Sequence, residues 1–144
     1  APGKPNAFGL IGGAANAIAP RKRPLSSMTP TIVQKDGQLV AALGSPGGSR
    51  IITVVLQVLL NLIDFDLNAQ SAVAESRLHH QCLPDQVDLE QGFSPDTRAL
   101  LESWGHRVVA AESLGHAMGI VRRPDGMLEG GADPRRTGGS ALGY

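Results

Sequence analysis

The chain has 144 residues, of which 42% are hydrophobic and 18% charged, a balance typical of a folded globular domain and too apolar for a disordered chain. Its 13 basic and 13 acidic residues cancel, aromatic residues make up only 3%, and the one dense basic run is Arg21-Lys22-Arg23, so nucleic-acid binding is not favoured. Because Cys82 is the only cysteine, a disulfide within the chain and a cysteine-only metal site are excluded.

The first 20 residues are rich in glycine, proline and small side chains, and Gly12-Gly13 and Asn16 interrupt every candidate period. They predict an extended arm, residues 1–20, ahead of a main portion, residues 21–144. The arm contains no charged-then-apolar segment of signal-peptide type, and it begins with Ala-Pro-Gly instead of Met. We therefore expect the chain to start within a larger product.

The next segments predict a β-hairpin followed by a long helix. Residues 31–34 and 39–43 are rich in Val, Ile, Leu and Ala and flank Asp36-Gly37, a strong signal for a tight hairpin turn. From Ser49, which we expect to cap the helix, to about Phe65, polar residues form one narrow stripe on an otherwise apolar helix. The members of that stripe are Arg50, Thr53, Gln57, Asn61 and Asp64.

Further elements follow in chain order. A short helix is predicted over about 68–75, and another begins at Ser94-Pro95 and ends at Trp104 before Gly105. Strands are predicted over 106–111 and 116–122, and a turn at 124–126 leads into a last strand. The order predicts an α+β fold with helices over antiparallel strands, unlike a doubly wound unit. The apolar run over 51–63 is shorter than the roughly 20 residues of a membrane span, so no span is expected.

The run GSPGGSR at residues 44–50 leaves three interpretations open. It can be a tight strand-to-helix turn that needs glycine, a phosphate cradle, or an oxyanion hole. A Walker loop requires Gly-Lys-Ser/Thr, whereas Ser49 follows Gly48 directly, which disfavours the phosphate cradle. Two successive glycines ahead of a helix expose two backbone N–H groups, as an oxyanion hole requires.

Polar residues outside this run are further candidates for a site. Ser26 and Ser27 precede the first strand and are either turn residues or hydroxyl ligands for a carboxylate. His79, His80, Cys82 and Asp85 lie close together in the sequence, but adjacent histidines on an extended chain point to opposite sides, so no metal site is expected. His106 and His116 are expected to be structural, and Arg135-Arg136 are expected to form a solvated turn.

The order of four motifs carries a family resemblance. The runs PLSSM-TPTIV, GSPGGSRI, LHHQCLPD and GADPRRTGGSALGY resemble the C-terminal part of the γ-glutamyltransferase small subunit, in a family of N-terminal-nucleophile hydrolases. The resemblance covers nearly the whole chain. It departs at Cys82, where the family usually has Trp, and we expect local repacking there without new chemistry.

The resemblance implies a four-layer αββα sandwich to which this chain contributes one part. It implies that Gly47 and Gly48 form the oxyanion hole, that Ser26 and Ser27 bind the donor's carboxylate, and that no metal or cofactor is used. The family's nucleophile is an N-terminal threonine freed by self-cleavage, whereas the five threonines here, at 29, 31, 53, 97 and 137, are internal. We therefore expect the rest of the small subunit and the large subunit as partners, a γ-glutamyl small molecule as substrate, and a periplasmic or extracellular location, as is typical of the family.

Two alternatives remain open. A cephalosporin or glutaryl acylase of the same superfamily shares the oxyanion chemistry, although the Ser26-Ser27 pair favours glutamyl recognition. A noncatalytic relative that keeps the fold as a binding or structural module belongs to a different functional class.

Overall fold

The structure is a computed structural model that describes residues 3–143, and its first strand pair is the predicted hairpin. Strand β1 (Thr31–Lys35) pairs antiparallel with β2 (Gln38–Gly44). Asp36 and Gly37 both have positive φ, 52° and 74°, the conformation that a two-residue hairpin turn of the primed type requires. The Asp-Gly signal therefore located this turn correctly.

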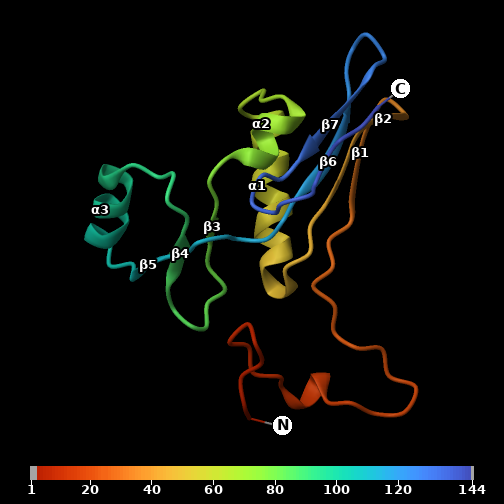
Figure 1. Ribbon diagram of the computed structural model, residues 1–144. Coiled ribbons are helices and arrows are strands. Elements are labelled where there is room, and N and C mark those ends of the chain that lie inside the picture. Colours follow the sequence, from red (N-terminus) through yellow and green to blue (C-terminus); the bar gives the residue numbers. More distant parts are fainter. Residues whose placement is uncertain (1–2, 144) are drawn as a thin grey trace.

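The hairpin is one half of a four-stranded antiparallel sheet with the order β1-β2-β6-β7 (Figure 1). Strands β6 (Met118–Arg122) and β7 (Leu128–Ala132) form the second hairpin, and β6 pairs with β2 at the centre. Gly131 lies directly beneath a helix, because a Cβ atom there would overlap the backbone of Ala69. The predicted strand over 116–122 and the hairpin after it are confirmed.

Two helices cover one face of this sheet, α1 (Ile51–Ile63) and α2 (Ala69–Ala74). Their apolar faces form the core with Leu43 of β2 and Ala117 just before β6, and its members are Leu43, Ile51, Val54, Val55, Val58, Ala72, Val73 and Ala117. Asn68 caps α2, with its side chain accepting from the Ser71 N–H. The predicted cap of α1 is wrong: a 3-10 turn, η2 (Gly48–Arg50), precedes the helix, and the Ser49 hydroxyl bonds elsewhere.

A second, three-stranded sheet has the order β3-β4-β5. Its strands are β3 (Leu78–His79), β4 (Val87–Leu89) and β5 (Val108–Ala110), and β4 runs parallel to β5. Helix α3 (Pro95–Ser103), capped by Ser94, makes the crossover between β4 and β5, as the Ser-Pro signal predicted. Strands β3 and β4 lie between the two predicted short helices, where the sequence predicted no strand, because runs of two and three residues are too short to show alternation.

The arm carries little regular structure. Its described part contains one 3-10 turn, η1 (Ala14–Asn16), and a bridge between Pro5 and Ile11. Figure 1 shows the arm below the N-terminal end of α1, from where the chain rises to β1. Within the described residues, no helix is both long and apolar enough to cross a membrane.

A cluster of four buried charged residues joins the two sheets. Arg77 pairs with Asp133 at 2.8 Å, and Arg135 pairs with Asp133 at 3.0 Å and with Glu90. Glu90 follows β4 and Asp133 follows β7, so the cluster connects one strand end of each sheet. Arg135 also donates to the carbonyl of Glu75 just after α2.

The burial of Arg135 corrects the prediction of a solvated Arg135-Arg136 turn. Only 12% of the Arg135 side chain is exposed, whereas Arg136 is exposed as predicted. Burial alone would raise the pKa of Glu90, but hydrogen bonds from Arg135 and from two backbone N–H groups hold that pKa below its ordinary value. The pKa of Asp133 is lowered in the same way, against burial, by hydrogen bonds from Arg135 and Arg77. Two positive and two negative charges thus neutralise one another in the interior.

Candidate functional site

The turn between β2 and α1 presents two successive glycine N–H groups. Gly47 has φ 143° and Gly48 has φ 60°, values that side chains with a Cβ atom rarely adopt. Within the described residues, neither N–H donates to a protein acceptor. The turn leads into η2 and α1, so both donors lie at the positive end of a helix dipole, where negative charge is stabilised.

Neighbouring segments hold this turn. The Ser45 hydroxyl accepts from the His116 N–H at 3.1 Å and donates to the Pro46 carbonyl at 2.8 Å. Gly47 lies against Gly115, whose Cα would be 3.5 Å from a Cβ on Gly47. The loop that precedes β6 therefore supports the turn from one side.

The arm contacts the turn from the other side. A Cβ atom on Gly48 would overlap the ring of Phe8, so only glycine leaves room for that ring. The sequence allowed a turn that needs glycine here but gave no sign of the contact with the arm, because 40 positions separate Phe8 from Gly48. Gly48 thus serves both the backbone conformation and the docking of the arm.

Ser26 and Ser27 leave the same end of the β1–β2 hairpin as the glycine pair. Thr31 at the start of β1 pairs with Leu43 near the end of β2. Ser27 lies four positions before Thr31, and Gly47 lies four positions after Leu43. Both residues therefore lie beyond the same end of the hairpin. The Ser26 hydroxyl accepts from the Met28 N–H at 3.2 Å, and Ser26 is exposed while Ser27 is half-buried. The described residues show no direct hydrogen bond between the serines and the glycines.

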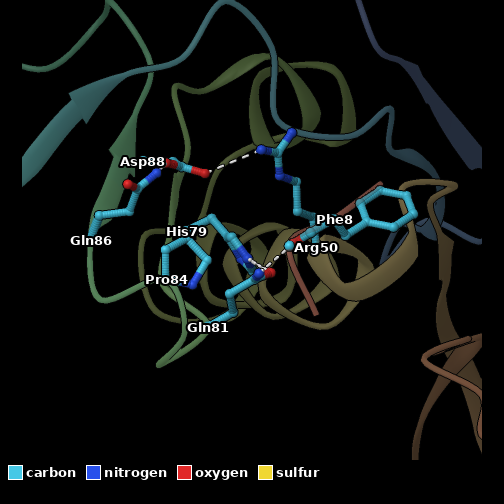
Figure 2. Close-up of a pocket in the computed structure, with 8 residues that line it drawn as sticks. Phe8, Arg50, His79, Gln81, Pro84, Gln86 and Asp88 are labelled. Atoms are coloured by element: carbon cyan, nitrogen blue, oxygen red, sulfur yellow. Dashed lines mark hydrogen bonds and ion pairs between the residues drawn. The ribbon is translucent and has the colours of Figure 1, made fainter. Parts of the chain in front are cut away.

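The side-chain amide of Gln81 links several parts of the site. Its oxygen accepts from the Ser49 hydroxyl at 2.8 Å. The same oxygen lies 2.9 Å from His79 Nε2, and the amide nitrogen donates to the Phe8 carbonyl at 2.6 Å (Figure 2). Gln81 lies inside the LHHQCLPD motif, but the sequence did not predict a role for it. Its contacts to Ser49 and Phe8 span 32 and 73 positions, and no spacing rule foresees them.

A cavity of about 200 Å³ lies between the arm and β4. Figure 2 shows the side chains around it, among which Arg50 and Asp88 form an ion pair at 3.2 Å. The other lining residues are Phe8, Gly9, His79, Gln81, Pro84 and Gln86.

Thr53, His79 and Gln81 form a line that resembles a hydroxyl–imidazole–acceptor relay. The Thr53 hydroxyl lies 2.7 Å from His79 Nδ1. However, His79 is only 3% exposed, and Thr53 does not line the cavity. The line therefore fixes α1 to β3 and does not present a nucleophile.

His79 and His80 differ in burial, as expected for adjacent positions on an extended chain. His79 is buried, whereas His80 is exposed and bonds Asp85 at 3.1 Å. Cys82 is exposed. Among the described residues, no group of three or more His, Cys, Asp or Glu side chains is arranged to hold a metal ion.

Comparisons with known proteins give the family. The family described as Gamma-glutamyltranspeptidase matches residues 1–143. The chain is 54% identical over 143 residues to the glutathione hydrolase proenzyme of Escherichia coli K12, covering 99% of this chain and 25% of that protein. It is also similar to a crystal structure of the T380A mutant of Helicobacter pylori γ-glutamyltranspeptidase, with TM-score 0.88 and 45% identity, covering 94% of this chain and 75% of that one.

The chain belongs to the γ-glutamyltranspeptidase family, whose members include autoprocessing N-terminal-nucleophile enzymes. The predicted α+β class is confirmed, and the four-stranded sheet with α1 and α2 on one face matches one α layer and one β layer of the expected sandwich. The chain spans about a quarter of the length of the curated relatives it matches. A crystal structure of a cephalosporin acylase from Bacillus halodurans is less similar than the Helicobacter pylori structure, with TM-score 0.67 and 31% identity. The match covers 76% of this chain and 22% of that one.

Proposed function

We propose that this chain works as part of a γ-glutamyltransferase, or glutathione hydrolase, that moves a γ-glutamyl group from glutathione or a related amide to water or an acceptor amine. Membership of the family supports the reaction class. The observation that carries the proposal for this chain is the Gly47-Gly48 turn, whose two N–H groups have no protein acceptor among the described residues.

In this reaction the glycine pair stabilises negative charge. A threonine hydroxyl supplied by a segment outside this chain attacks the γ-carbonyl carbon, and the carbonyl oxygen becomes an oxyanion. The N–H groups of Gly47 and Gly48 donate to that oxyanion, and each such donor lowers the barrier by about 3–4 kcal/mol. The C–N bond then breaks, the protonated amine leaves, and water or an acceptor amine attacks the resulting ester.

The serine pair holds the other end of the donor. The hydroxyls of Ser26 and Ser27 donate to the α-carboxylate without adding charge of their own. Their position at the same end of the hairpin as the glycine pair supports this role. We propose that the remaining small-subunit segment and the large subunit supply the threonine and the groups that hold the donor's α-amino group.

The test compares two donors on the complete protein that contains this chain. γ-Glutamyl and glutaryl anilides differ only in the α-amino group, which the first has and the second lacks. A γ-glutamyltransferase releases aniline from the γ-glutamyl compound and at least about 100-fold more slowly from the glutaryl compound, because its amino-binding groups are left unpaired. Preference for the glutaryl donor would overturn the proposal.

The similarity to cephalosporin acylase keeps that activity as the second candidate. It predicts efficient hydrolysis of glutaryl amides. A noncatalytic relative predicts turnover of neither donor.

A further inference from the structure

The side-chain amide of Gln81 has four hydrogen-bond partners, two for its nitrogen and two for its oxygen. The nitrogen donates to the carbonyls of Phe8, at 2.6 Å, and Leu83, at 3.1 Å. The oxygen faces Ser49 Oγ at 2.8 Å and His79 Nε2 at 2.9 Å. An amide with two donors and two acceptor sites occupied is held in one orientation.

The two carbonyl partners decide which way the amide points. Carbonyl oxygens only accept, so the atom facing Phe8 and Leu83 must be the NH₂ group. The amide oxygen consequently faces His79, and His79 Nε2 must carry a proton in order to donate to it. His79 is in turn fixed to α1 through Thr53.

Both ends of this amide act on the glycine turn. Ser49 follows Gly48 directly, so its bond to Gln81 fixes the backbone on the C-terminal side of the two free N–H groups. The bond to the Phe8 carbonyl fixes the arm at the residue whose ring covers Gly48.

We propose that Gln81 is a positioning residue for the γ-glutamyl reaction, holding the Gly47-Gly48 turn through Ser49 and the arm through Phe8. This inference rests on the proposed function. It assigns Gln81 no contact with substrate. Gln81 affects turnover through the position of the two glycine N–H groups, because a displacement of about 1 Å can slow a reaction by roughly 100-fold.

The experiment uses three variants of the complete protein and one matched control. Gln81→Met removes the amide but keeps a side chain of similar length. Gln81→Glu keeps an oxygen that accepts from Ser49 and His79, but it places a second oxygen against the Phe8 and Leu83 carbonyls. Ser49→Ala removes one hydrogen bond and leaves the amide in place. Gln57→Met is the control, because Gln57 also makes three hydrogen bonds, two to the Leu78 backbone of β3 and one to the Thr53 carbonyl within α1, but none to the arm or to Ser49.

Two readouts separate positioning from stability: kcat and KM with a γ-glutamyl anilide, and amide hydrogen exchange of residues 5–12. Gln81→Met should lower kcat by about 10- to 100-fold with little change in KM and speed exchange in the arm. Gln81→Glu should speed exchange in the arm while keeping most of kcat, and Ser49→Ala should lower kcat and leave the arm's exchange unchanged. Gln57→Met should match the unaltered protein in kcat and arm exchange, whatever its melting temperature.

Three results would overturn the inference: equal kcat values for Gln57→Met and Gln81→Met, unchanged kcat in Ser49→Ala, or unchanged arm exchange in Gln81→Glu. If Gln81→Met does not fold, the Ser49→Ala and Gln81→Glu measurements decide. Failure of the proposed function looks different, because then the unaltered protein itself does not turn over the γ-glutamyl donor.

Discussion

Ser26 and Ser27 differ in the bonds that their hydroxyls already make. Ser26 Oγ accepts from the Met28 N–H, which fixes the turn and leaves the hydroxyl proton free to donate. No side-chain hydrogen bond of Ser27 is found within the described residues, and Thr29 donates to its carbonyl. Both hydroxyls can therefore donate to a carboxylate without breaking an existing bond.

Replacing both serines with alanine should weaken γ-glutamyl recognition in the complete protein. Each lost bond to a charged group costs about 1.5–3 kcal/mol, or about 10- to 100-fold in kcat/KM. A 4-aminobutanoyl anilide, which is the γ-glutamyl donor without its carboxylate, should show no further loss. Ser103→Ala, on the exposed end of α3, is the control. Equal losses with both donors would contradict a role in carboxylate binding.

At the scale of elements, the polar stripe on α1 shows what the sequence could predict and what it could not. The periodicity located the stripe correctly, but four of its five members bond to neighbouring segments, among them Arg50, which pairs with Asp88. Thr53 contacts His79, Gln57 bonds the Leu78 backbone, and Asn61 donates to the Ala72 carbonyl. Local signals also predicted both hairpins, a short helix near residues 68–75 and the Ser94-Pro95 start of α3.

The elements that sequence missed depend on distant partners. Strands β3 and β4 are too short to carry a period and exist through pairing with each other and with β5. Arg135 is buried because Glu90, 45 positions earlier, is brought to it by the fold. Neither fact is encoded in a local pattern.

The charged cluster predicts different effects for two adjacent arginines. Arg135→Met should lower the free energy of unfolding by about 3–5 kcal/mol, because it leaves Glu90 and Asp133 with one fewer partner in the interior. Arg136→Met should change it by less than about 0.5 kcal/mol, because Arg136 is exposed. Thermal melting of the two variants measures the difference. Equal melting temperatures would show that the cluster contributes nothing to stability.

The same cluster predicts a loss of stability in acid. The pKa values of Glu90 and Asp133 are lowered in the folded state. Their contribution to the free energy of unfolding is therefore fully present above the ordinary pKa values of 4.5 and 3.8, and it is lost as pH falls through the lower pKa values of the folded state. Arg135→Met removes the side-chain hydrogen bonds that Arg135 gives to both carboxylates, so both pKa values should rise and the fall should begin at higher pH. Melting temperatures measured between about pH 7 and pH 3 test this, and a variant curve parallel to that of the unaltered protein would contradict it.

At the scale of the whole chain, two apolar surfaces remain uncovered. One is the sheet face opposite the helices, and the other is a stripe along α1. The members of the first are Ile32, Met118, Ile120 and Leu128, each at least 50% exposed, and those of the second are Ile52, Leu56, Leu60 and Ile63, each at least 38% exposed. Surfaces of this kind mark interfaces with other protein layers.

Expressed alone, the chain should therefore aggregate or bind a hydrophobic dye. Ile32→Thr with Ile120→Thr should reduce dye binding by the isolated chain, because both residues lie on the open sheet face. In the complete protein the same pair should lower stability, since that face is then expected to be covered. A monodisperse, cooperatively unfolding monomer of the unaltered chain would contradict this expectation.

The proposed role of Gly47 and Gly48 in stabilising the oxyanion of a γ-glutamyl transfer can be tested most directly with Gly48→Ala. The added Cβ strains a left-handed residue by about 1–2 kcal/mol and overlaps Phe8, so the variant is measured with and without Phe8→Ala, which restores room for the methyl group. On active-site-titrated complete protein, kcat should fall by about 100-fold in both backgrounds while the folded fraction is retained. Recovery of kcat by Phe8→Ala, or a lower melting temperature with normal kcat, would show that this glycine serves only the turn and the arm.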